Sequence, residues 1–156
     1  MKKIMFVCHG NICRSPMAEF IMKDMLVRAG LEKDAFVSSS ATSSEEIWNG
    51  VGNPIYPPAR EMLKKHGISC EGKRAVLLKS SDYDKYDIFI CMDNNNVRNA
   101  IRIFGSDREN KVKKLMDYTA RGGEVADPWY SGNFDVAYND IQEGCKALFK
   151  ELFGSN

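Results

Sequence analysis

The sequence predicts one α/β domain over residues 1–156, with a four-stranded parallel sheet that carries helices on both faces. Two observations predict this fold. The apolar runs Ile4–Val7 and Ile88–Met92 are continuous, as in strands that are buried on both faces. Each run is followed by a segment with helical periodicity, and strands that alternate with helices pair in parallel. Ligands of such folds bind beyond the carboxyl ends of the strands.

The first half of the chain supplies two strands and two helices. After the first apolar run, Pro16 stands where a first helical turn tolerates proline, and apolar side chains then recur at three- and four-residue spacing until Gly30. Ala35–Val37 is the second predicted strand, and serine and threonine residues follow it. The pair Pro57-Pro58 begins a helix that Gly67 ends.

The second half of the chain supplies the other two strands. Ser80–Asp82 is expected to cap a short helix before the second apolar run. Asp93 then caps a helix whose apolar side chains end at Phe104. Lys111–Met116 is the fourth predicted strand. The last helix carries one apolar stripe, formed by Tyr138, Ile141, Cys145, Leu148 and Leu152.

Composition and charge exclude several classes of protein. The net charge is +1, so neither nucleic-acid binding nor attraction to an acidic membrane is expected. No apolar stretch approaches the roughly 18 residues of a membrane span, and we expect no signal peptide and no membrane insertion. The five cysteines are scattered without a CxxC pair, and the two histidines make no zinc-finger pattern. We therefore expect a reduced, cytoplasmic protein.

The loop after the first strand reads Cys-His-Gly-Asn-Ile-Cys-Arg-Ser, from Cys8 to Ser15. The residues between Cys8 and Arg14 can wrap into a semicircle whose backbone N–H groups point inward at the start of a helix. Gly10 and Asn11 are residue types that adopt left-handed backbone angles at low cost. The pattern predicts a cradle for a tetrahedral oxyanion such as phosphate.

Cys8, Arg14 and Ser15 have the chemistry to act on such an anion. The N–H groups, the positive helix end and Arg14 favour the thiolate form of Cys8, beneath a bound phosphate and in line for attack. The planar guanidinium of Arg14 matches two phosphoryl oxygens, and Ser15 can donate its hydroxyl to the thiolate. The alternative is that Cys8 is an inert buried thiol and Arg14 a surface residue. This interpretation is the poorer one, because it does not explain the glycine and asparagine of the loop or the helix start that follows.

The stretch "VCHGNICRSPMAEF" resembles the phosphate-binding loop of the low-molecular-weight protein tyrosine phosphatases, and "ADPWY" resembles their general-acid segment. The segments "SSSAT", "KKHGI" and "ICMD" extend the resemblance over nearly the whole chain. It implies that Cys8 is the nucleophile and forms a phosphocysteine, and that Arg14 binds the phosphate. It also implies that Asp127 protonates the leaving phenol and then activates water. An Asp-Pro pair commonly begins a turn, but the loop upstream favours the acid role.

That family lines its pocket with aromatic side chains, which suit a phenyl ring better than an alkyl phosphate. Trp129 and Tyr130 follow the Asp-Pro pair, and Trp48 in "EEIWNG" matches an aromatic residue on the facing loop, with simple partial burial as the alternative for Trp48. The resemblance therefore implies that the substrate-binding residues are His9, Gly10, Asn11, Ile12, Cys13, Ser15, Trp48, Trp129 and Tyr130.

Asn11 resembles the asparagine that makes the loop rigid in this family, and Ser39 and His66 resemble the partners that hold it. His66 lies near a predicted helix end, so capping and core packing are alternatives for it. His9 departs from the apolar or small residue expected after the nucleophile. At the pocket rim His9 would attract anionic substrates; alternatively it faces solvent.

Ile12 and Cys13 bear on the activity and its regulation. Arginine phosphatases built on this loop resemble the pattern with threonine at the position of Ile12, so isoleucine favours tyrosine phosphate. The resemblance also suggests a reversible disulfide between Cys8 and Cys13 that blocks over-oxidation, with a small buried thiol as the alternative for Cys13.

The resemblance implies a phosphatase that needs neither metal nor organic cofactor, acts on a phosphotyrosine-containing protein and releases inorganic phosphate. Two other functions stay open. An arsenate reductase of the same fold needs two further cysteines for a thiol relay, and Cys91 in "CMDNNNVRN" has no near partner. A phosphate-binding module without catalysis is expected to lack a nucleophile or an acid, whereas Cys8, Arg14 and Asp127 are all present.

Overall fold

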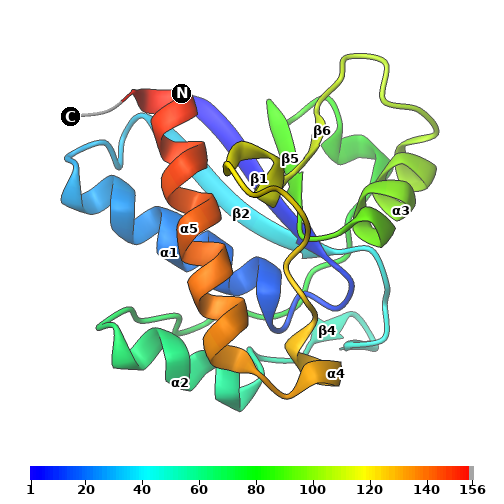
Figure 1. The fold of residues 1–156 in the computed structure, drawn as a ribbon. Coiled ribbons are helices and arrows are strands. Elements are labelled where there is room, and N and C mark those ends of the chain that lie inside the picture. Colours follow the sequence, from blue (N-terminus) through cyan, green and yellow to red (C-terminus); the bar gives the residue numbers. More distant parts are fainter. Residues whose placement is uncertain (155–156) are drawn as a thin grey trace.

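Four parallel strands form the central sheet of the computed structural model, which describes residues 1–154 and so leaves the predicted domain's last two residues outside (Figure 1). The order is β2-β1-β5-β6. Phe6 of β1 pairs with Ser39 of β2 on one side and with Ile90 of β5 on the other. The strands run over β1 Lys2–Cys8, β2 Ala35–Ala41, β5 Ile88–Cys91 and β6 Val112–Lys114. The predicted four-stranded parallel sheet is confirmed.

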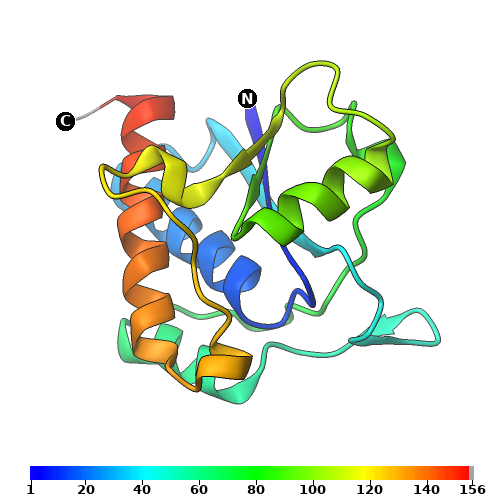
Figure 2. The same cartoon turned by 45° about the vertical axis from the view of Figure 1, so that its right-hand side comes forward.

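Helices cover both faces of this sheet, as predicted (Figures 1 and 2). Helices α1, α2 and α5 pack together on one face, and α3 packs on the other. The helices are α1 Arg14–Arg28, α2 Pro57–Lys65, α3 Asn94–Phe104, α4 Pro128–Ser131 and α5 Phe134–Phe153. Two short 3₁₀ turns lie in the connections: Ser80–Asp82 precedes β5, and Leu115–Tyr118 follows β6. Within residues 1–154, no helix combines the length and the apolar character that a membrane crossing requires.

Alternate residues of β1 build two separate cores. Ile4 and Phe6 pack with the helices α1, α2 and α5, whereas Met5 and Val7 pack on the side of α3. A strand between two helical layers has no solvent-facing side, which explains why its apolar run is continuous in the sequence. The same burial holds β1 in register, because a slip of one residue would exchange its two faces.

The sheet and helix ends differ from the sequence prediction in three places. Strand β2 continues to Ala41 through three serines, and their hydroxyls have partners; Ser40, for example, donates to the sulfur of Met5. Strand β6 is shorter than predicted, because a 3₁₀ turn begins at Leu115. Helix α1 begins at Arg14, so the residue that ends the loop also starts the helix.

A small antiparallel hairpin, β3 Ile47–Trp48 and β4 Val51–Gly52, was not predicted. Its turn residues Asn49 and Gly50 both have positive φ, as this tight type of hairpin turn requires. A Cβ atom on Gly52 would lie 1.9 Å from the carbonyl oxygen of Ala75, so only glycine fits there. Figure 2 shows the hairpin projecting from the body of the molecule.

The carboxyl ends of β1 and β5 bring distant segments to one edge of the sheet. Cys8 ends β1, and Asp93 follows β5 and caps α3, since its Oδ1 accepts from the N–H of Asn96 at 2.8 Å. The N–H of Val125 donates to the carbonyl of Met92 at 3.0 Å, which ties the segment before Asp127 to the same edge.

Candidate active site

The loop from Cys8 to Cys13 wraps over the start of α1. Asn11 has a φ of 58°, the left-handed angle that the sequence predicted for it, and its N–H lies 3.2 Å from the Cys8 sulfur. Gly10 does not share that angle, which corrects the prediction. Its lack of a side chain serves close packing instead, because a Cβ there would lie 3.3 Å from Cγ of Glu46.

The sulfur of Cys8 lies at the base of this loop and is almost fully buried. Ser15 Oγ lies 2.9 Å from it. The amide of Asn11 donates to the same Ser15 oxygen at 2.7 Å, so the hydroxyl proton of Ser15 is directed to the sulfur. A thiolate at this position is stabilised by two donors and by the positive end of α1.

Asn11 is held by three partners. Its Nδ2 donates to Ser15 and, at 2.9 Å, to Ser39 Oγ, while its Oδ1 accepts from the N–H of Val76 at 3.0 Å. Ser39 therefore lies where the sequence predicted. His66 does not: its Nδ1 lies 2.9 Å from the Met62 carbonyl and its ring stacks on Tyr138, so it is a helix-end residue and the prediction that it holds Asn11 is wrong.

A buried ion pair lies behind Ser39, and the sequence analysis missed it. Ser39 Oγ donates to Glu19 Oε1 at 2.6 Å, and Lys73 Nζ lies 3.6 Å from the same carboxylate. Lys73 also donates to the Ser39 carbonyl at 3.1 Å. Burial lowers the pKa of Lys73, against the raising effect of Glu19. The sequence did contain one sign of this pair, because Glu19 is an acidic residue among the apolar positions of α1. Its partner Lys73 could not be inferred, because it lies far along the chain.

Arg14 is 3% exposed, and acidic groups surround its guanidinium. Nη1 donates to Asp93 Oδ2 at 2.7 Å and to the Val125 carbonyl at 2.9 Å, and Nη2 lies 3.5 Å from Asp127 Oδ2. Burial lowers the pKa of Arg14, but Cys8, Asp93 and Asp127 together raise it. The side chain is therefore a fixed cation beside the sulfur. The sequence predicted Asp93 as a helix cap but not as a partner of Arg14.

Asp127 caps the short helix α4 and reaches the same site. Its Oδ1 accepts from the Trp129 N–H at 3.0 Å, which leaves Oδ2 on the side of Arg14. The carboxylate is only partly buried, so it can exchange protons with solvent. Asp127 and Cys8 therefore line the same cavity at the edge of the sheet, although they are far apart in the sequence.

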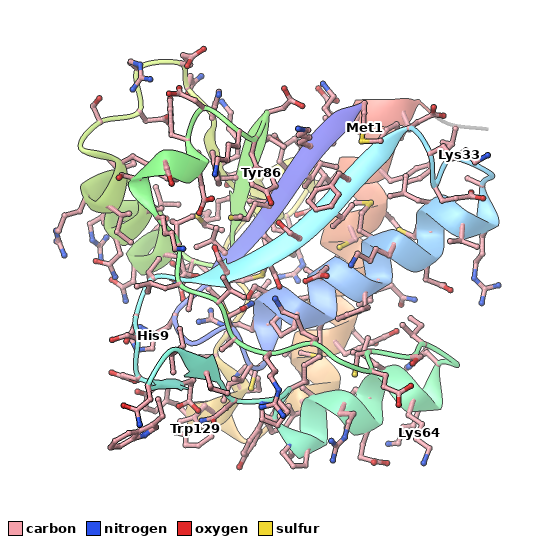
Figure 3. The ribbon with its side chains drawn as sticks, turned by 180° about the vertical axis from the view of Figure 1, so that it is seen from behind. Met1, His9, Lys33, Lys64, Tyr86 and Trp129 are labelled. Carbon is pink, nitrogen blue, oxygen red and sulfur yellow. The ribbon has the colours of Figure 1, made fainter. Side chains whose placement is uncertain are left out.

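A cavity of about 120 Å³ opens above the loop. Two of its lining residues, His9 and Trp129, lie at the end of the molecule opposite Met1 and Lys33 (Figure 3). Trp129 packs on Tyr56, with ring centroids 4.8 Å apart, whereas Tyr130 is 85% exposed. The lining residues are Cys8, His9, Gly10, Asn11, Ile12, Cys13, Arg14, Glu45, Glu46, Asp127, Trp129 and Tyr130.

Trp48 does not line the cavity, which corrects the prediction of an aromatic residue on the facing loop. It belongs to the projecting hairpin and is 74% exposed. The side chains that line the cavity from that segment are Glu45 and Glu46 instead. Two-residue strands give no periodic pattern in the sequence, so the direction of Trp48 could not be inferred.

The five cysteines are all free thiols, and burial distinguishes them. Burial, with a smaller effect of Cys8, raises the pKa of Cys13 to about 12. Burial also raises the pKa of Cys70, Cys91 and Cys145. Cys91 is fully buried within β5 and does not line the cavity. Among residues 1–154, no three His, Cys, Asp or Glu residues cluster as a metal site would require.

Comparison with known proteins identifies relatives over the whole fold. The family model described as low molecular weight phosphotyrosine protein phosphatase matches residues 3–155. YfkJ of Bacillus subtilis, a low molecular weight protein-tyrosine-phosphatase, is 35% identical over 154 residues, 97% of this chain and 96% of that protein. Its crystal structure matches with a TM-score of 0.92, at 34% identity over 97% of this chain and 94% of that chain.

Two other similar solved structures are those of a tyrosine phosphatase and an arginine phosphatase. SP-PTP of Streptococcus pyogenes, a low molecular weight protein tyrosine phosphatase, has a TM-score of 0.86 and 34% identity, covering 98% of this chain and 94% of its own. YwlE of Bacillus subtilis, an arginine phosphatase, has a TM-score of 0.82 and 28% identity, covering 96% of this chain and 95% of its own.

Proposed function

This chain belongs to the low molecular weight phosphotyrosine protein phosphatase family and is a protein tyrosine phosphatase, and on that premise we propose that Cys8, Arg14 and Asp127 perform its reaction. One observation carries the proposal. The Cys8 sulfur lies 2.9 Å from Ser15 Oγ and 3.2 Å from the Asn11 N–H, at the base of a loop that leads into α1. A thiol in these surroundings is a nucleophile poised beneath an anion.

In the first step the Cys8 thiolate attacks the phosphorus of phosphotyrosine. An S–P bond forms and the P–O bond to the phenol breaks, and the protonated carboxyl of Asp127 gives its proton to the departing oxygen. Arg14 and the loop N–H groups bind the phosphoryl oxygens and stabilise the charge that spreads over them. The products of this step are tyrosine and a phosphocysteine.

In the second step Asp127, now a carboxylate, takes a proton from a water molecule that attacks the phosphocysteine. The S–P bond breaks, inorganic phosphate forms, and the Cys8 thiolate returns. Ser15 assists here, because its hydroxyl proton is directed to the sulfur and stabilises the thiolate as it leaves. Asp127 acts as acid in one step and as base in the other, and its partial exposure allows that cycle.

The cavity supports an aryl phosphate as the substrate class. Trp129 and Tyr130 line it on the side of Asp127, Ile12 adds an apolar contact, and the packing of Trp129 on Tyr56 holds one aromatic wall in place. A phenyl ring gains contact area there that a shorter alkyl phosphate cannot. We infer a phosphotyrosine-containing protein as substrate, inorganic phosphate as product and the cytoplasm as compartment, without nucleic acid or membrane insertion.

The two alternative functions are less well supported. YfkJ and SP-PTP, which match over the whole chain at 34–35% identity, are named tyrosine phosphatases, and Cys91 is a fully buried thiol rather than a partner for a relay with Cys8, so arsenate reduction is not favoured. A module that only binds phosphate would have no use for Asp127 beside Arg14. Turnover separates such a module from an enzyme.

Hydrolysis of para-nitrophenyl phosphate tests the residue roles. We expect Cys8→Ser to abolish turnover and Asp127→Ala to lower kcat by roughly 10²–10⁴-fold. The exposed Asp135 at the start of α5 provides the control, since Asp135→Ala should retain wild-type kcat. EDTA should have no effect, and vanadate should inhibit the wild type. A loss below about tenfold in Asp127→Ala would remove that residue from the acid role.

A further inference from the structure

We propose that Glu45 and Glu46 make this phosphatase selective for phosphotyrosine flanked by lysine or arginine, an inference that rests on the proposed function. Both carboxylates line the cavity, where the family resemblance had predicted an aromatic wall. They therefore act on the residues of a substrate next to the phosphotyrosine rather than on the phosphate itself.

Backbone hydrogen bonds hold this acidic segment beside the phosphate-binding loop. The N–H of Thr42 donates to the Cys8 carbonyl and the N–H of Ser43 donates to the His9 carbonyl, each at 3.0 Å. The N–H of Glu45 then donates to Ser43 Oγ at 3.2 Å. The segment is thus fixed to the two residues that begin the loop, and it cannot move away without breaking these bonds.

The two carboxylates are held in different ways. Glu46 accepts from the side-chain amide of Asn53 at 3.0 Å, and its Cγ packs at Gly10. Glu45 lies 3.1 Å from His9 Nε2, and its side chain is 67% exposed. Glu46 is therefore an oriented wall of the cavity, whereas Glu45 reaches into the solvent at its mouth.

The charge at the mouth of the cavity is negative. His9 is the basic residue there and pairs with Glu45, while Glu46 adds a second carboxylate to the lining, so the local charge is negative whether or not the ring of His9 is protonated. Arg14 lies at the base, 3% exposed and already paired with Asp93. Arg74 does not line the cavity, and its guanidinium donates to the Gly52 carbonyl. Since the whole chain has a net charge of +1, this acidity is a local feature.

A bound phosphotyrosine is anchored by its phosphate, so neighbouring residues of the substrate must pass over this mouth. A lysine or arginine there is attracted to the carboxylates, and an aspartate or glutamate is repelled. Each such contact between exposed charges changes affinity by up to roughly fivefold and weakens as salt screens it. The expected role of His9 in attracting anionic substrates is therefore reversed: Glu45 pairs with it, and the mouth selects against anionic flanking residues.

Three phosphotyrosine peptides that differ only in the flanking residues, arginine, glutamine or glutamate, test the proposal. We expect kcat/KM to fall in that order, with about tenfold between the arginine and glutamate peptides at low ionic strength. The ratio should shrink in 0.5 M sodium chloride. In the double variant Glu45→Gln/Glu46→Gln it should fall below about twofold, because the charges are gone while the shapes remain.

Asp84→Asn is the matched control variant. Asp84 forms an exposed ion pair with Arg108 at 2.9 Å, much as Glu45 does with His9, but it precedes β5 and so lies away from the strand ends that meet the site. It should keep the wild-type ratio. Equal kcat/KM for all three peptides, a preference for glutamate, or an unchanged ratio in the double variant would overturn the proposal. Absence of turnover of every peptide and of para-nitrophenyl phosphate would instead contradict the proposed function.

Discussion

At the scale of single residues, the environment of Cys8 distinguishes it from four other thiols. Cys8 and Cys13 both line the cavity, but burial raises the pKa of Cys13 to about 12, so Cys13 remains a neutral thiol near neutral pH. Cys91 and Cys145 are fully buried, and burial raises the pKa of Cys70 above its ordinary value. Since the thiolate is the reactive form, the reactivity of the protein toward electrophiles should be that of one residue.

Iodoacetate should therefore label Cys8 alone at near-neutral pH. The reagent is an anion, and the loop that we propose binds phosphate should draw it to the sulfur. Vanadate should protect, and Cys8→Ser should remove the fast labelling. Peptide mapping by mass spectrometry after short exposures gives the measurement. Labelling of Cys13 as rapid as that of Cys8 would contradict this account.

Some residues were predictable because their signal is local. The loop from Cys8 to Ser15 carries its chemistry in consecutive residues, and Asp93 was predicted as a helix cap from its place after a strand. The ion pair between Asp93 and Arg14 joins residues 79 positions apart, and nothing local announces it. His66 was misassigned for the same reason, since its stacking partner Tyr138 lies on the last helix.

At the scale of elements, α1 and β2 are joined behind the loop by the buried carboxylate of Glu19. Glu19→Gln should leave the amine of Lys73 buried without a counter-charge, and we expect it to lower the free energy of unfolding by about 2 kcal/mol or more. Urea unfolding gives the measurement. The control on the same helix is Asp24→Asn, whose pair with Arg28 is exposed and should cost less than about 0.5 kcal/mol.

A second variant separates the charge from the loss of packing. Glu19→Gln/Lys73→Met removes the two buried ions and leaves only the half-exposed amine of Lys23, the other partner of Glu19, so part of the lost stability should return. If Glu19→Gln is as mild as Asp24→Asn, or if the double variant is the least stable of all, the buried pair does not join α1 to β2.

Elements were predictable in proportion to their length. The runs of β1 and β5 and the periodic helices cover enough residues for a pattern to emerge. The hairpin β3–β4 has only two residues in each strand, too few for a periodic pattern, and its one local sign, the turn pair Asn49-Gly50, was not used in the sequence prediction. That gap led to the wrong position for Trp48 and hid the role of the acidic residues before it.

At the scale of the whole molecule, buried thiols link stability to pH. Burial raises the pKa of Cys13 to about 12 and that of Cys91 and Cys145 in the same direction, above their ordinary 9.0. A group whose folded pKa is raised contributes its full stability below the unfolded pKa. That contribution is lost as pH rises toward the folded pKa, because the unfolded thiol then releases a proton that the folded one keeps.

We therefore expect the free energy of unfolding to fall above about pH 9 by about 1.4 kcal/mol per pH unit for each such thiol. Cys145→Ala isolates one of them. The variant should be less stable than the wild type at pH 8, because it leaves a small void, but its decline between pH 9 and 10.5 should be shallower by that amount. Parallel declines in urea midpoints would contradict the link.

The fold as a whole was predictable because a doubly covered parallel sheet requires continuous apolar strands and alternating helices, and both are visible in the sequence. The cavity was predictable in part. Its base comes from one loop, whereas its rim joins the acidic segment before the hairpin to Asp127 and the start of α4, whose approach depends on bonds such as that from Val125 to Met92. Such contacts over long chain separations are set by the finished fold.

Capture of the covalent intermediate is the decisive experiment for a two-step reaction on Cys8. Wild-type enzyme is mixed with a ³²P-labelled phosphotyrosine peptide, quenched with detergent within milliseconds and mapped by mass spectrometry. The account predicts phosphate on Cys8, at a level that rises in Asp127→Ala if the activation of water is the step most slowed. Phosphate on another residue, or steady turnover with no labelled protein at any time, would contradict a two-step reaction on Cys8.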